Sequence, residues 1–347
     1  VSSHHDEIKS TRDALKPEMN SLTFHNRFFN FFSRKSFLFV SWFFLVMSAL
    51  NLNADIPKPS HSFMIIVDIT LSMNTKDIKI NGDQFSRIRF VKESVEDAVR
   101  ELPCGTKVGM GIFAGYQTSL LFNPVEVCDN YSDLVRSFSF IETNMIWTGD
   151  SEVSKGIYNS IKTLSKFDPN TRLVFITDGH EAPPIAPAYR PRFDDPKKHI
   201  KGLLVGVGNL KQTKIPKINS DGEQTGFWSE DEVMQYDPFT LGRKGSDANE
   251  KLVDNESSKV DPYLVEQIQA TPGKEHLSQL KEKYLMLLSS EIGFSYLRLI
   301  DGKNLGKKMH DVSFSEWRKV NTKLSGIFAA CGFFFLMLAF FPVTLGS

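Results

Sequence analysis

The segment Met64-Ile-Ile-Val-Asp-Ile-Thr-Leu-Ser72 joins a short apolar run directly to side chains that carry oxygen. The apolar run predicts a buried strand, and Asp68, Thr70 and Ser72 then follow at its carboxyl end. Open α/β sheets bind their ligands at this end of their strands. The segment therefore predicts a sheet with a ligand site where its first strand ends.

A second segment has the same design. Leu173-Val-Phe-Ile176 leads into Thr177-Asp-Gly179, so the carboxylate of Asp178 also follows an apolar strand. Carboxylates and hydroxyls are the ligands that hard divalent cations prefer. The two segments together predict a cation site, with Mg²⁺ as the preferred ion and Mn²⁺ or Ca²⁺ as alternatives. A simpler alternative is that Asp68 and Thr70 only cap the turn after the strand.

Strands and helices alternate between residues 60 and 310, and the strands are apolar. This pattern predicts one α/β domain with a mainly parallel sheet that helices cover on both faces. Residues 209–272 lack a strong period and are expected to form an extended insertion, and residues 53–60 a linker. We expect strands near 62–69, 107–114, 117–123, 171–177, 202–208 and 296–300, and helices near 86–102, 130–138, 152–166 and 276–290.

Two apolar runs flank this domain. Residues 36–52 and 324–345 contain no charged side chain. The second run is long enough to cross a bilayer core of ~30 Å, and both are predicted to be transmembrane helices. For the first run, the core of a cleaved signal peptide is the alternative.

Basic residues near the two runs set the expected orientation. Arg34 and Lys35 precede the first run, which places residues 1–35 in the cytoplasm and the domain outside it. Arg318, Lys319 and Lys323 precede the second run and favour the opposite orientation. Because the first span usually dominates, we expect a two-span protein of the bacterial inner membrane with a periplasmic domain.

Charge and cysteine content add two expectations. Lys plus Arg equals Asp plus Glu at 41 each, so the charge balance does not favour a nucleic-acid partner. Cys104 and Cys128 lie equally far in sequence from Tyr116, the expected turn of a hairpin. Antiparallel pairing would bring them together, which predicts a disulfide in an oxidising compartment. Two buried free thiols are the alternative.

The oxygen-bearing segments resemble a known family. Asp68-x-Thr70-x-Ser72 resembles the first element, usually Asp-x-Ser-x-Ser, of the metal-ion-dependent adhesion site of von Willebrand factor type A domains. Thr177-Asp178-Gly179 resembles its last element. Ser151-Glu-Val-Ser-Lys-Gly156 resembles the middle element, with serine where the family has threonine. Thr148 is the alternative to Ser151. The ligands that this resemblance implies are Asp68, Thr70, Ser72, Ser151 and Asp178.

The resemblance covers about 60–310 and implies a doubly wound, six-stranded sheet. Its expected strand order is 3-2-1-4-5-6, with strand three antiparallel. It also implies a docking role, in which an Asp or Glu of a protein partner completes the coordination of the cation. His180 and Glu181 follow the last element, and they are expected either beside the site or as exposed loop residues.

The same segments argue against catalysis. Neither an activated nucleophile nor an acid/base pair is evident, so we expect a protein that is not an enzyme. Thr70 stands where hydrolases of the haloacid-dehalogenase type carry a second Asp, which disfavours a metal-dependent hydrolase. The glycine pattern of a Rossmann nucleotide site does not follow the first strand.

A narrower resemblance concerns the whole arrangement. The strings 67–74, 102–109, 177–184 and 203–208 are similar to those of the type A membrane proteins of bacterial methanol-oxidation gene clusters. That similarity implies maturation, including metal insertion, of a periplasmic quinone-dependent methanol dehydrogenase. Other membrane assembly proteins and a MoxR-type AAA+ ATPase would be further partners. The alternatives are an aerotolerance-type membrane protein or a metal-dependent adhesin.

Overall fold

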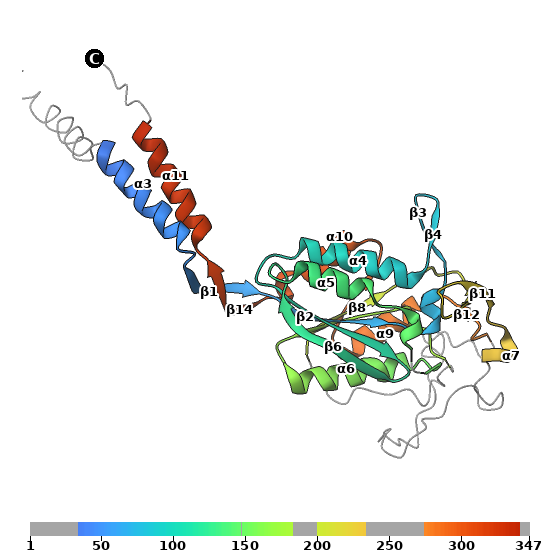
Figure 1. Cartoon of the computed structure of the whole chain (residues 1–347). Helices are drawn as coiled ribbons and strands as arrows, with labels where there is room; N and C mark the ends of the chain where they lie inside the picture. The colour runs from blue at the N-terminus through green and yellow to red at the C-terminus, as the bar shows by residue number, and fades with distance from the viewer. Residues whose placement is uncertain (1–33, 147, 183–199, 234–273, 341–347) are drawn as a thin grey trace, which may run out of the picture. The chain divides into compact units, whose positions relative to one another are not determined.

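The structure is a computed structural model that describes residues 34–146, 148–182, 200–233 and 274–340. These residues fall into two compact units (Figure 1). One unit spans 58–318, and the other comprises the described parts of 1–57 and 319–347. The larger unit contains the sheet and the candidate site.

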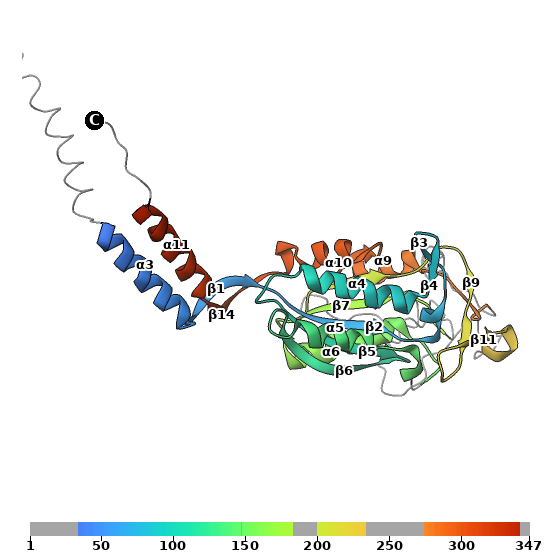
Figure 2. The same cartoon turned by 45° about the horizontal axis from the view of Figure 1, so that its top comes forward.

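The larger unit is built on a six-stranded sheet in the order β13-β8-β7-β2-β5-β6. Every neighbouring pair is parallel except β5 and β6. Figure 2 shows β7, β2, β5 and β6 side by side. The predicted order and the antiparallel third strand are therefore confirmed. The strands are β2 (Ser62–Asp68), β5 (Lys107–Ala114), β6 (Gln117–Glu126), β7 (Arg172–Thr177), β8 (Gly202–Gly206) and β13 (Ser295–Arg298).

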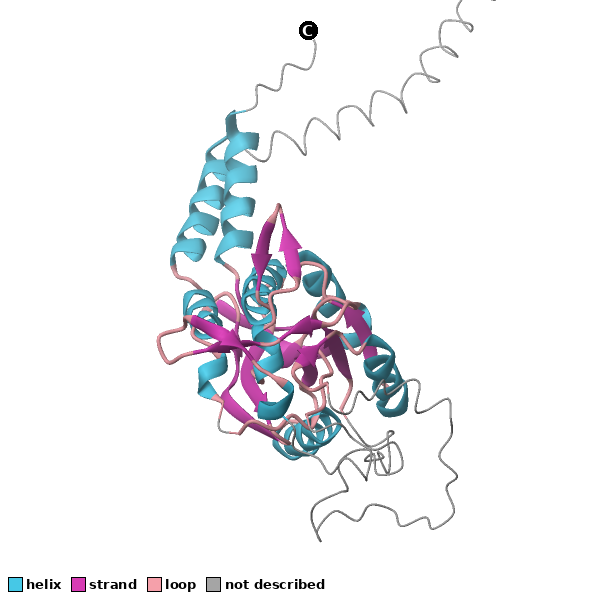
Figure 3. Ribbon diagram, turned by 90° about the vertical axis from the view of Figure 1, so that its right-hand side faces the viewer, coloured by secondary structure: helices cyan, strands magenta, loops and turns pink. Residues whose placement is uncertain are grey.

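Helices cover both faces of the sheet (Figures 1 and 3). Side chains of β2 alternate between the two faces, as strand geometry requires. Phe63, Ile65 and Val67 enter the core that includes residues of α4, α5 and α10. Met64 and Ile66 enter the core that includes residues of α6 and α9. The helices are α4 (Arg87–Glu101), α5 (Tyr131–Ser139), α6 (Val153–Phe167), α9 (Glu282–Ile292) and α10 (Gly302–Met309).

Replacing Gly156 with alanine is expected to destabilise the domain by about 1–2 kcal/mol. A Cβ at this position of α6 would lie 2.1 Å from the ring of Phe113. Phe113 is fully buried against Phe175, with ring centroids 5.3 Å apart, so its ring has no space to move away from the added methyl group. The overpacking outweighs the roughly 1 kcal/mol that alanine gains in a helix. Denaturant unfolding measures the loss, and Gly226→Ala, where a Cβ meets open space, is the control. Equal stability of both variants would contradict this packing.

One predicted helix boundary is wrong, and the expected insertion contains short elements. The helix expected at 276–290 begins only at Glu282, because Leu277–Ser278 form the short strand β12, which pairs with β9 (Thr213–Lys214). The expected insertion contains ordered elements, and its residues 234–272 lie outside the described part of the chain. These elements have two to four residues each, too few to produce a period. They are β9, β10 (Pro216–Ile218), β11 (Gln224–Phe227) and α7 (Glu230–Val233).

The smaller unit contains a pair of helices, α3 (Arg34–Ala49) and α11 (Ser325–Phe340). The Ser41 hydroxyl donates to the Gly332 carbonyl at 2.8 Å, and the rings of Phe44 and Phe335 stack. Within the described part of the chain, no helix combines the length and the apolar character needed to cross a membrane. The two predicted spans stay a prediction, and residues 341–345 of the second lie outside the described residues.

Residues 53–60, predicted to be a linker, instead form the strand β1 (Asn53–Ser60). Its partner is β14 (Glu316–Lys323) in a two-stranded sheet. Prolines predicted a linker here, but a strand at a sheet edge tolerates proline because it need not donate every N–H. The prediction failed because the partner strand lies far away in the sequence.

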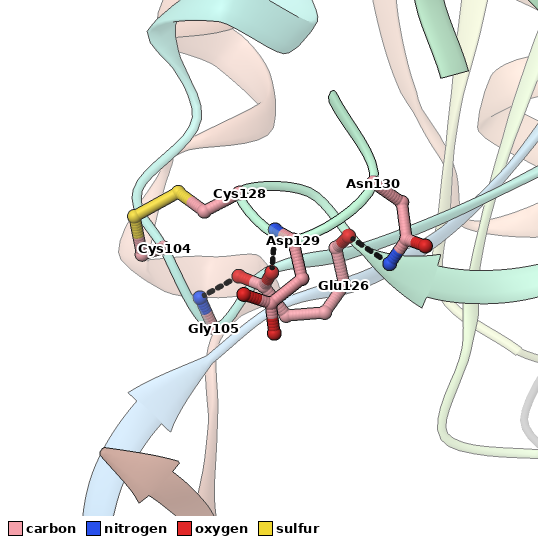
Figure 4. The surroundings of a disulfide bond; sticks show 6 residues. All are labelled: Cys104, Gly105, Glu126, Cys128, Asp129 and Asn130. Atoms are coloured by element: carbon pink, nitrogen blue, oxygen red, sulfur yellow. Dashed lines mark hydrogen bonds between the residues drawn. A yellow bond between two sulfur atoms is a disulfide. The ribbon is translucent and has the colours of Figure 1, made fainter. Parts of the chain in front are cut away.

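The structure joins Cys104 and Cys128 through a disulfide, with their Cα atoms 5.3 Å apart (Figure 4). The Glu126 carboxylate accepts the backbone N–H groups of Gly105 and Asp129, both at 2.6 Å. Each of these residues directly follows one of the cysteines. Glu126 therefore fixes the backbone on both sides of the bridge.

Candidate cation site

Asp68 is the last residue of β2 and is fully buried. Its Oδ1 accepts the Thr70 N–H at 2.9 Å and the Thr70 hydroxyl at 2.6 Å. Its Oδ2 accepts the hydroxyl of Thr177, the last residue of β7, at 2.6 Å. The two segments singled out in the sequence thus meet at one edge of the sheet, through adjacent parallel strands.

The hydroxyls predicted as ligands lie beside this carboxylate. A 3-10 turn (Leu71–Asn74) follows Thr70 and brings the Ser72 hydroxyl 3.3 Å from the Thr70 hydroxyl. The Ser72 side chain also hydrogen-bonds Asp178, which helps to lower the pKa of that carboxyl. The structure therefore brings Asp68, Thr70, Ser72 and Asp178 together, and all four are buried.

The electrostatics of the two carboxylates favour a cation. Burial raises the pKa of Asp68 to about 7, and the nearby charge of Asp178 adds to the rise. Burial would also raise the pKa of Asp178, but the Arg87 guanidinium and other partners outweigh burial and lower it. A divalent cation beside both groups would remove the repulsion between them and favour ionised Asp68.

Ser151 lies just before α6 and crosses the end of β2. Its backbone forms bridges to Gly115, which follows β5, and to Ala182, which follows β7, and these two strands flank β2. The buried Ser151 hydroxyl has no hydrogen-bond partner among the described residues. Thr148 is half-buried, and its hydroxyl faces the Asp150 N–H at 3.4 Å. A buried hydroxyl without a partner calls for a ligand, so the residues present fit a hard divalent cation.

Sequence reasoning missed Arg87, the first residue of α4. Its side chain is fully buried, and its guanidinium donates to Asp178 and to Asp77. An arginine at the start of an amphipathic helix is usually exposed, so the helical period of α4 did not indicate that Arg87 is buried. Its partners are 10 and 91 residues away in the sequence.

His180 and Glu181, which follow Asp178, are buried, so of the two alternatives the exposed loop is wrong. Glu181 accepts the Ser154 N–H at 3.1 Å and the Tyr284 hydroxyl at 2.8 Å, and so it caps the first turn of α6. Burial lowers the pKa of His180 to about 4 and that of Lys281 to about 8. Both groups are therefore held closer to their neutral forms than exposed side chains would be.

One family model matches part of the larger unit. Residues 63–180 match the family model of the von Willebrand factor type A domain. The match spans all three segments that carry the predicted ligands. No curated protein matches the sequence.

Solved structures similar to this chain include two from Bacteroides. The conserved hypothetical protein BatB of Bacteroides thetaiotaomicron is 17% identical, with 73% of this chain and 98% of that chain covered and a TM-score of 0.45. An aerotolerance-related membrane protein of Bacteroides fragilis has the same identity and coverage and a TM-score of 0.43.

Proposed function

We propose that this domain is a protein-docking module that depends on a divalent cation, Mg²⁺ before Mn²⁺ or Ca²⁺. The observation that carries the proposal is the pair of buried carboxylates, Asp68 and Asp178, beside buried hydroxyls. Hydroxyls bring no charge, and Arg87 already neutralises part of Asp178. A cation held here would remain attractive to an incoming Asp or Glu of a partner protein.

Ser151→Ala is expected to weaken Mg²⁺ and Mn²⁺ binding by the full-length chain about tenfold or more, because it removes a proposed direct ligand. Thr148→Ala is the matched control, since its hydroxyl lies a few residues away in the same loop, and it should leave affinity unchanged. Titration calorimetry with each cation measures both. If the wild-type chain binds neither cation, the docking proposal fails. If Thr148→Ala alone weakens binding, the ligand assignment is reversed.

We further propose that the chain lies in the bacterial inner membrane, with residues 36–52 and 324–345 as spans and the domain in the periplasm. In support, the helices of the smaller unit expose large aromatic side chains, among them Phe39 at 67%, Trp42 at 60% and Phe334 at 60%. Exposed apolar surface of this kind is typical of a membrane or protein contact. The redox state of the pair Cys104 and Cys128 in cells tests this placement.

Only resemblances to known proteins indicate which exported protein the module serves. Maturation of a periplasmic quinone-dependent methanol dehydrogenase, with a MoxR-type AAA+ ATPase as a further partner, rests on short sequence strings, and no comparison adds to it. The alternative is an aerotolerance-type role, a description that one of the similar structures carries in its name. In the maturation role the domain would help to assemble another protein rather than catalyse a reaction.

Deleting the gene is expected to separate these roles. In the maturation role, methanol dehydrogenase protein is made but purifies inactive and without its calcium. In the aerotolerance role, the dehydrogenase is unaffected and survival after oxygen exposure falls. Calcium content of the purified enzyme and viable counts after aeration measure the two outcomes. A deletion strain that is normal in both assays would reject both roles while leaving the cation site untouched.

A further inference from the structure

Arg87 is the largest fully buried side chain among the described residues. An arginine in the interior is strongly destabilising unless its charge and its N–H groups are matched. Here two carboxylates match it: Asp178, from the candidate cation site, and Asp77, from the loop after the 3-10 turn. The Asp77 carboxylate accepts hydrogen bonds from Arg87 Nε at 3.1 Å and from Arg87 Nη2 at 2.6 Å. The guanidinium fork is therefore part of the site's supporting structure.

The same guanidinium contacts Ser278 directly and Asn209 through Asp77. Its Nη1 donates to the Ser278 hydroxyl at 2.6 Å, and that hydroxyl donates onward to Asp178 Oδ2 at 3.1 Å. Asp77 Oδ2 also accepts the N–H of Asn209, at 2.9 Å. We call the described residues 209–233 and 274–278 the insertion segment. Its first residue and its last are both anchored to partners of Arg87.

The backbone just before the insertion segment passes close to the Arg87 side chain. Gly208, just before the insertion segment, has a φ of +117°, and a Cβ there would lie 2.6 Å from Arg87 Nε. The segment therefore leaves the sheet in direct contact with the guanidinium. Figure 2 shows its strands β9 and β11 at the same end of the larger unit as the hairpin β3 (Ile78–Ile80) and β4 (Asp83–Phe85).

The contacts of Asp178 show what this arrangement does to the cation site. Asp178 Oδ2 accepts from Arg87 and from Ser278, while Oδ1 accepts the His180 N–H at 2.9 Å. Each carboxylate oxygen offers two lone pairs. Those of Oδ2 are used by Arg87 and Ser278, and the Ser72 hydroxyl, itself a predicted ligand, also hydrogen-bonds this carboxylate. Arg87 and Ser278 thus fix the orientation of the Asp178 carboxylate beside Ser72, the hydroxyl that is predicted to bind the same cation.

We propose that Arg87 and Ser278 are positioning residues that couple the cation site to the insertion segment, an inference that rests on the proposed function. Groups that orient a metal ligand typically change metal affinity 10–100-fold when removed. Coupling is reciprocal: if an anchored segment favours the cation, the cation must favour the anchored segment by the same factor. Cation binding therefore stabilises the anchored residues Asn209 and Ser278, and with them the described residues 209–233, beside the site where a partner would dock.

Ser278→Ala tests the coupling with little risk to folding, because it leaves the pairs of Arg87 with Asp77 and Asp178 intact. Ser289→Ala is the matched control: Ser289 is also buried, but its hydroxyl donates to the Leu285 carbonyl within α9. The full-length chains are titrated with Mg²⁺ and Mn²⁺ by calorimetry. Hydrogen exchange is then followed at residues 209–233, with and without Mg²⁺. Arg87→Lys, which keeps the charge and loses the fork, is the second variant.

In the wild-type chain and in Ser289→Ala, Mg²⁺ should bind and slow exchange in residues 209–233. Ser278→Ala should bind Mg²⁺ about tenfold more weakly, and saturating Mg²⁺ should no longer slow exchange there. Arg87→Lys should show the same loss in both readouts. Equal behaviour of Ser278→Ala and Ser289→Ala would overturn the coupling while leaving the docking proposal standing. A wild-type chain that binds no cation would overturn both.

Discussion

Asp68→Asn is expected to abolish divalent-cation binding and, in the cation-free protein, to raise stability above pH 7. Burial and Asp178 raise the pKa of Asp68 from 3.8 to about 7, so the folded state binds a proton that the unfolded state has lost. Between these two values the contribution of Asp68 to stability falls as pH rises. Asparagine does not ionise, so its advantage over Asp68 should grow from near zero at pH 4 to about 4 kcal/mol above pH 7.

The measurement is denaturant unfolding of both proteins at pH 5 and pH 8, in a chelator and then in excess Mg²⁺. Burial lowers the pKa of His180 to about 4, which adds the opposite slope between pH 4 and 6.5. That slope is common to both proteins, so the difference between them is the quantity to compare. The exposed Asp83→Asn serves as control. If the stability difference does not change with pH, the charge interaction between Asp68 and Asp178 is refuted. If Mg²⁺ binding survives in Asp68→Asn, Asp68 is not part of the cation site.

The sequence predicted those parts of the fold that depend on neighbouring residues in the chain. Each parallel strand is buried on both faces, so it appears as a continuous apolar run, and the carboxylate after the run marks its carboxyl end. That is why Asp68, Thr70, Ser72 and Asp178 could be placed at one edge before the structure. The strand order required the family resemblance, because an apolar run does not identify its neighbours.

The rest depends on contacts between distant residues. Arg87 meets partners at 77, 178 and 278, and none of these spacings follows a helical or strand period. β12 contains two residues and exists because β9 lies beside it. The sequence could not decide whether Ser151 or Thr148 is the middle ligand, because both lie in a loop. The bridges of Ser151 to Gly115 and Ala182, and its unpaired hydroxyl, support the proposal of Ser151 as the ligand.

Removing the disulfide with the double variant Cys104→Ser, Cys128→Ser is expected to lower the unfolding free energy by about 3 kcal/mol. The bridge closes a loop with a sequence separation of 24, and loops of this size give a stabilisation of that order. The hairpin itself should persist, because Glu126 and the pairing of Lys107 with Glu126 do not involve the sulfurs. Denaturant unfolding of the wild type with and without a dithiol reductant should reproduce the same loss.

The cysteine pair also reports the compartment of the domain. If residues 58–318 lie in the periplasm, alkylation of intact cells followed by mass analysis should find Cys104 and Cys128 protected as a disulfide. Cys331 of α11 is not bridged and is the internal reference for alkylation under denaturing conditions. Alkylation of Cys104 and Cys128 in freshly trapped cells would mean that the domain faces a reducing compartment. The orientation set by Arg34 and Lys35 would then be inverted, and Arg318, Lys319 and Lys323 would prove to be the dominant topology signal.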